Sequence, residues 1–213
     1  MDFKLIFIAI GIAILFEGSF FFALSLIYRQ REKKYLKFAN TFLFEVAPSF
    51  KEKSGIANCL LLFGIVISIF PYIYYVAYNV NTFAMTIAII SILMAFCLVC
   101  LPFISLNKLR EHYYLALGGL VTLMALLIME GYYCYRLYRL YLDNMQLVGM
   151  IVAFSLALFT LVAIFNPKLF DLKNTQNEAG EYVRKKFIFL SFVEWMLYPF
   201  SILALVPLLL VAM

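Results

Sequence analysis

Three glutamates interrupt the long apolar stretches of this chain: Glu17, Glu130 and Glu194. A charged side chain at the centre of a membrane-spanning helix costs about 2.5–3.5 kcal/mol on insertion scales, so such residues are candidates for function. A carboxyl group at that depth can exchange a proton or bind a cation. The favoured alternative is structural: a protonated glutamic acid that hydrogen-bonds between helices. Contact with a lipid headgroup or a substrate amine is a third interpretation.

The positions of Glu17 and Glu194 in their stretches predict that both lie between the cytoplasmic half and the middle of the bilayer. Glu17 is 11 residues from Tyr28, where the first stretch ends, or about 16 Å deep at the helical rise. Glu194 is seven residues past Phe187, where the last stretch begins, or about 10 Å deep. The two carboxyls are therefore expected in neighbouring layers, and the sequence leaves open whether they face each other.

Prolines in the last stretch add a second chemical feature. Pro199 has no N–H, so the carbonyl of Trp195 is expected to lose its helical partner, one residue from Glu194. A carboxylate beside a freed carbonyl is how broken helices build cation or proton sites in transporters. Pro207 predicts a second break nearer the outer end. Glu17, Glu194, Trp195 and Pro199 form the candidate proton or cation site.

Glu130 is expected in a different setting, near the outer interface. It lies about 25 Å along its helix from the inner end, where its carboxyl can reach water at little cost. Arg136 and Arg139 follow it among tyrosines. These three residues are candidates for contact with outer headgroups or an extracytoplasmic partner.

The elements that must position these residues are long apolar helices. Hydrophobic residues make up 66% of the 213-residue chain and charged residues 14%, against about 25% charged in a soluble domain. A bilayer core needs about 20 apolar residues per helix, and lipid admits only helices or closed barrels. The stretches do not alternate as barrel strands do. We therefore predict one all-α domain over 1–213, a bundle of six transmembrane helices at about 4–28, 56–78, 83–106, 113–139, 146–166 and 187–212.

Charge in the loops predicts the orientation. Fourteen of the 17 Lys and Arg residues lie in the loops 29–55, 107–112 and 167–186. The positive-inside rule makes this side cytoplasmic, so both termini are expected outside a plasma (inner) membrane. The first apolar run is about 25 residues, longer than a signal peptide's 7–15, and reads as a retained helix.

Residues 33–46 are predicted to form an amphipathic helix on the cytoplasmic membrane surface. Lys33, Lys34 and Lys37 share its polar side, whereas Phe38 and Phe42 belong to its apolar side. A membrane anchor is the favoured interpretation. The 29–55 loop as a docking site for a cytoplasmic partner such as an ATPase is the second, and a helix folded back onto the bundle is the third.

Several classes of site lack the residues that they need. His112 is the only histidine, so a bis-His haem or a His-based metal triad within one chain is excluded, and we expect no metal or cofactor. Cys97 and Cys100 are interpreted as small packing residues. Phosphate-loop and serine-nucleophile motifs are absent, and the basic residues flank the apolar stretches instead of forming a nucleic-acid-binding domain.

Three function classes remain. The first is a small ion-coupled transporter, or the membrane subunit of one, that uses Glu17 and Glu194. The second, weighted equally, is a non-catalytic integral subunit of a larger membrane complex, or a homo-oligomer. The third is a membrane-embedded lipid enzyme, which ranks last because catalytic residue types are scarce. The sequence therefore favours a protein that is not an enzyme and whose constant partner is the lipid bilayer.

Overall fold

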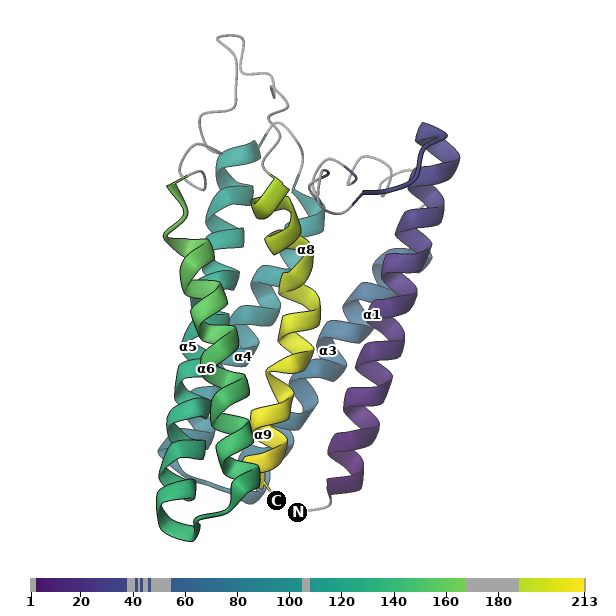
Figure 1. The fold of residues 1–213 in the computed structure, drawn as a ribbon. Helices are drawn as coiled ribbons and strands as arrows, with labels where there is room; N and C mark the ends of the chain where they lie inside the picture. The colour runs from purple at the N-terminus through teal and green to yellow at the C-terminus, as the bar shows by residue number, and fades with distance from the viewer. Residues whose placement is uncertain are drawn as a thin grey trace.

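The structure is a computed structural model that describes residues 3–37, 41, 43, 46, 55–104, 108–167 and 188–212. Regular structure in this part of the chain is helical (Figure 1). The elements are α1 (Phe3–Glu32), α3 (Gly55–Tyr78), α4 (Thr82–Cys100), the short 3-10 helix η1 (Leu101–Phe103), α5 (Leu109–Tyr141), α6 (Asn144–Ile164), α8 (Ile188–Leu203) and α9 (Leu205–Ala212).

The predicted six-helix membrane bundle is confirmed. Six helical segments within the described residues are long and apolar enough to cross a membrane. Among the departures from the predicted bounds, α4 ends at Cys100 instead of 106, whereas α5 begins before 113 and ends after 139. Its extra turns carry polar and tyrosine residues, which an apolar window excludes but a helix accommodates.

The helices run up and down, so both termini lie at the same end of the bundle (Figure 1). At that end, very short connections join α3 to α4 and α5 to α6. Asn81 begins α4 by accepting a hydrogen bond from the Ala84 N–H at 2.8 Å, and Asp143 begins α6 by accepting one from Met145. Leu142 ends α5 in the left-handed conformation, with φ 53°. Which end faces the cytoplasm remains a prediction from charge.

The last transmembrane segment, α8 followed by α9, is the central element of the bundle. In its most apolar stretch 72% of residues are buried, against 28–44% in the other five segments. The expected break at Pro199 is wrong in position: α8 continues through Pro199, and the interruption lies at Ala204. Pro207 then falls in the first turn of α9, where a helix does not need the missing N–H.

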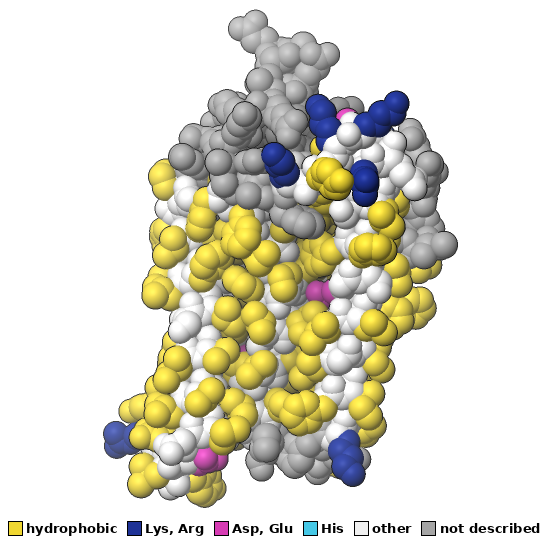
Figure 2. All heavy atoms as spheres, turned by 45° about the vertical axis from the view of Figure 1, so that its right-hand side comes forward, with side chains coloured by type: hydrophobic (Ala, Val, Ile, Leu, Met, Phe, Trp, Pro, Cys, Tyr) yellow, Lys and Arg dark blue, Asp and Glu magenta, His cyan; other side chains and the backbone are white. Residues whose placement is uncertain are grey.

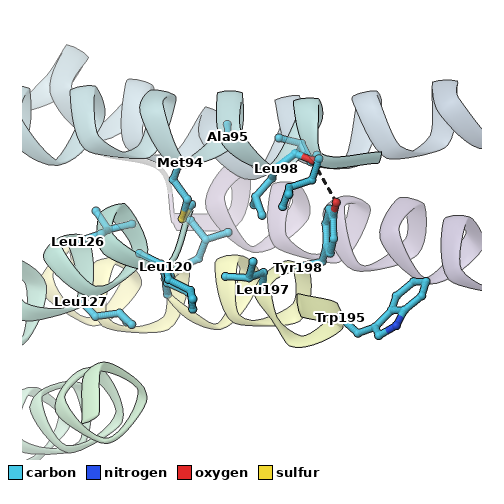
Figure 3. Packing of buried hydrophobic residues seen from close by; sticks show 14 of the residues in the cluster. Met94, Ala95, Leu98, Leu120, Leu126, Leu127, Trp195, Leu197 and Tyr198 are labelled. Atoms are coloured by element: carbon cyan, nitrogen blue, oxygen red, sulfur yellow. Dashed lines mark hydrogen bonds between the residues drawn. The ribbon is translucent and has the colours of Figure 1, made fainter. Parts of the chain in front are cut away.

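Tyr198 links the central helix to α4 by a hydrogen bond to a carbonyl that a proline leaves without a helical partner. Pro102 in η1 has no N–H, so the carbonyl of Leu98 lacks its helical partner. The Tyr198 hydroxyl donates to that carbonyl at 3.1 Å (Figure 3). Around this bond pack Met94 and Ala95 of α4 with Leu120, Leu126, Leu127 and Leu197. A buried hydroxyl therefore satisfies a buried carbonyl at the centre of the core.

Cys97 packs against α5, in keeping with its interpretation as a packing residue. A side-chain carbon added to Gly118 would lie 3.2 Å from the Cys97 sulfur, tighter than ordinary contact. The missing side chain of Gly118 thus lets α4 and α5 approach closely.

The predicted surface helix does not begin at residue 33. Lys33 ends α1 in the left-handed conformation, with φ 52°, and 33–37 are not helical. Lys33, Lys34 and Lys37 are exposed, as expected for a basic membrane-facing segment. Phe38 and Phe42 lie outside the described residues. The described Leu43 and Val46 are helical and fully buried, so these two residues pack onto the bundle instead of facing the membrane surface.

Candidate functional site

Glu194 lies in a closed polar cluster at the loop-rich end of the bundle. One carboxyl oxygen accepts a hydrogen bond from the Leu43 backbone N–H at 3.3 Å. The other lies 3.0 Å from Nε2 of His112, in the first turns of α5. Glu194 and His112 are each about 95% buried. This pairing was not predicted from the sequence, because a single histidine 82 residues from a glutamate carries no spacing signal.

Trp195 fixes the same loop segment to α8. Its indole N–H donates to the Thr41 carbonyl at 2.6 Å, and its ring packs 5.7 Å from that of Phe21. Trp195 is 1% exposed and is the only tryptophan in the chain. Glu194 and Trp195 therefore join three elements: the first loop, α1 and the central helix.

Glu17 has a different environment from Glu194. It is 2% exposed at the middle of α1, yet neither carboxyl oxygen has a hydrogen-bond partner among the described residues. Gly64 of α3 sets its position: a side-chain carbon there would lie 2.9 Å from Cγ of Glu17. The carboxyl is thus held in place without being satisfied, which is costly for a buried polar group.

Glu17 lines a lateral groove between α1 and α8. The groove has a volume of about 330 Å³, and its other walls are apolar. Its lining residues are Ile14, Glu17, Gly18 and Phe21 of α1 with Pro199, Ile202 and Leu203 of α8. Figure 2 looks onto this side of the molecule, where apolar side chains cover the middle and basic groups lie at the two ends.

A second lateral groove, of about 390 Å³, runs between α1 and α3. It is lined by Leu5, Ile8, Ala9, Ile12, Val66, Ile67, Phe70 and Ile73. Neither groove reaches Glu194. Both of these grooves flank α1, whose most apolar stretch is only 28% buried, as is that of α6.

Tyr198 lies near both glutamates of the predicted site. It follows Glu194 by one helical turn, and it interacts electrostatically with the carboxyls of both Glu194 and Glu17. Its ring packs against the rings of Phe20 and Phe21 of α1, one turn beyond Glu17. The structure therefore places both glutamates of the predicted site in the surroundings of one tyrosine.

Glu130 does not reach outer water as the sequence predicted. It is 0% exposed and lies on the face of α5 that carries Leu123, Leu127 and Cys134. Because α5 continues for 11 residues beyond Glu130, this residue does not lie at the end of its helix. Its position on the inward face of α5 therefore decides its burial. The Tyr72 hydroxyl of α3 is its neighbour across the helix interface. In the described structure neither group meets the distance and angle criteria for a hydrogen bond.

At the end of the bundle where the termini lie, α5 and α6 hold α9 through polar contacts that the sequence did not single out. Cys134 donates to the Pro207 carbonyl at 3.8 Å, and Gln146 donates to the carbonyl of Leu210. Leu210 lies in the last turn of α9, where carbonyls lack helical partners. The sequence signal that could have indicated these contacts was Gln146, a polar residue two positions into α6. Arg136 and Arg139 are exposed beyond this region.

These sites give the chain buried acids but no cluster of three or more metal-ligating side chains among the residues described. Comparison with protein-family models, curated proteins and solved structures finds no match.

Proposed function

We propose that this multi-pass membrane protein is a non-catalytic integral subunit of a larger membrane complex, with its partner packed along α1. The observation that carries this proposal is that both lateral grooves flank α1. Apolar exposure alone would not suffice, since lipid solvates an apolar helix as well as a protein core does. A concave surface is different, because a partner can fill it more completely than mobile lipid chains can.

The interior of the bundle supports the same role. Glu194 is engaged by Leu43 and His112, and the central helix is the most enclosed segment. Neither groove extends to Glu194, as a substrate path to that residue would. A packed interior with an incompletely covered flank is typical of a subunit.

Photo-crosslinking in native membranes tests this role. A photoreactive amino acid at Ile14, which is 54% exposed in the α1–α8 groove, is expected to capture another protein chain. The matched control is Leu158 of α6, which is 60% exposed but lines neither groove. Equal capture at both positions, or lipid adducts alone at Ile14, would contradict the proposal.

A small ion-coupled transporter is the second candidate, favoured by the position of Tyr198. Its neighbours Glu17 and Glu194 place two carboxyls near one tyrosine hydroxyl of the proline-containing central helix. Carboxyl groups in such positions carry protons or cations in transporters.

Flux measurements separate this candidate from the subunit role. If the chain conducts alone, purified protein in liposomes should carry H⁺, Na⁺ or K⁺ down an imposed gradient. Glu194→Gln should then reduce that flux at least about tenfold, because a neutral amide cannot exchange a proton or compensate a cation. The control variant is Ser25→Ala, because Ser25 is a partly buried residue of α1. Flux that survives in Glu194→Gln would rule out this role for Glu194.

A further inference from the structure

The Glu17 carboxyl is buried without a hydrogen-bond partner among the residues that the structure describes, and the sequence places no Lys or Arg at its depth. Glu17 lies 14 residues from Phe3 and 15 from Glu32, or about 21 Å from either end of α1. No Lys or Arg occurs anywhere in 5–28, 54–107, 111–135, 140–167 or 187–213. His112, the only histidine, lies against Glu194. A basic partner for Glu17 must therefore come from outside this chain.

The depth of Glu17 restricts what that partner is. Lipid headgroups lie about 15 Å from the bilayer centre, so a headgroup amine does not reach the middle of α1. An acyl chain reaches the groove but offers no polar group. A transmembrane helix carries a basic side chain to any depth, and polar side chains within membranes pair with one another across helices.

The shape of the groove fits the ridge of a helix. From Ile14 to Phe21 it follows α1 for two turns, or about 10 Å. Gly18 lies in its wall, and a side-chain carbon there would meet nothing within 4 Å. An approaching helix therefore has room beside Gly18 and meets Glu17 one residue away, while Gly64 of α3 packs against Cγ of Glu17.

We infer that the α1–α8 groove receives a transmembrane helix of another subunit that carries a lysine or arginine at mid-membrane, paired with Glu17. This inference rests on the proposed subunit role and adds the identity of the groove and the chemistry of the partner. The pair would neutralise two charges that are each costly alone in the membrane.

A designed helix tests the pairing without knowledge of the natural partner. The probe is a synthetic 24-residue Leu/Ala transmembrane peptide with one central lysine and a fluorescent acceptor. It is mixed with donor-labelled full-length protein in phosphatidylcholine vesicles, and association is measured by energy transfer. We expect the lysine probe to bind about tenfold more tightly than the same peptide with leucine at that position. Moving the lysine seven residues, or about 10 Å, towards one end should remove the preference.

Variants of the protein locate the interaction. Glu17→Gln should bind both probes equally, and its retained elution profile after heating shows that it is folded. Gly18→Trp should weaken binding by filling the groove, whereas Gly11→Trp is the matched control, because Gly11 is equally open but lines neither groove. A lysine preference that persists in Glu17→Gln, or is absent from the parent protein, would overturn the inference.

The two proposals fail in distinguishable ways. If Ile14 captures a native chain but the parent protein shows no lysine preference, the subunit role stands and the pairing is wrong. If Ile14 captures only lipid, the subunit role fails whatever the probe shows. If Ile14 captures a second copy of this chain, the pairing is also wrong, because no copy carries a basic residue at that depth.

Discussion

Replacing Trp195 with alanine is expected to lower the free energy of unfolding by about 3 kcal/mol and to release the first loop from the bundle. In a bilayer the unfolded helices are surrounded by lipid, so the loss comes from packing and hydrogen bonding more than from transfer out of water. Trp195 contributes both, because its ring packs against Phe21 and its N–H binds the Thr41 carbonyl.

Trp195→Phe separates these two contributions. The phenyl ring retains much of the contact with Phe21 but cannot donate to Thr41, so we expect a loss of about 1 kcal/mol. Stability is measured as the fraction of protein that stays monodisperse on size-exclusion chromatography after heating. Limited proteolysis near Thr41 should be faster in both variants. An alanine variant as stable as the phenylalanine variant would mean that the ring does not hold the loop.

The arrangement of membrane-crossing helices was predictable because the bilayer imposes it. Each span must be apolar over about 20 residues, so the six stretches stand out from the short polar connections. The same uniformity hides the packing. In α1 both the inward and the outward faces are apolar, and for this reason no periodicity in the sequence tells that Glu17 borders a groove.

The surroundings of the acidic residues could not be predicted from their depth in the membrane alone. Distance along the helix placed Glu130 near outer water, but the face of α5 on which it lies turns it inward, beside Tyr72. Glu194 was recognised as costly, whereas its partners come from a distant histidine and from a backbone N–H in the first loop. Such pairings depend on tertiary packing and leave no pattern in neighbouring residues.

The missing N–H of each proline was predictable from the sequence, but its effect on the helix was not. A missing N–H is certain from sequence, but its effect depends on which groups lie nearby. At Pro199 the helix continues, and at Pro102 the freed carbonyl is satisfied by Tyr198 from another helix. Only near Pro207 does the helix break, with α9 beginning two residues earlier.

Replacing Gly64 with leucine is expected to destabilise the protein by about 3 kcal/mol and to push α1 away from α3. Even the first carbon of a side chain would lie 2.9 Å from Cγ of Glu17 and 3.3 Å from its backbone nitrogen. The backbone contact matters most, because it yields only if the whole helix shifts. Gly11→Leu is the control: the site is open, and leucine favours helix more than glycine does, so stability should stay level or rise.

A double-mutant cycle then tests whether Gly64 is what positions the Glu17 side chain. Gly64→Ala alone should cost about 1–2 kcal/mol. Glu17→Ala removes Cγ, the nearest atom, so Gly64→Ala should cost less by about 1 kcal/mol in that background. Both free energies come from the same heating and chromatography assay. Strict additivity would show that the helices adjust around the added methyl group, and that the buried carboxyl of Glu17 is free to turn away from the groove.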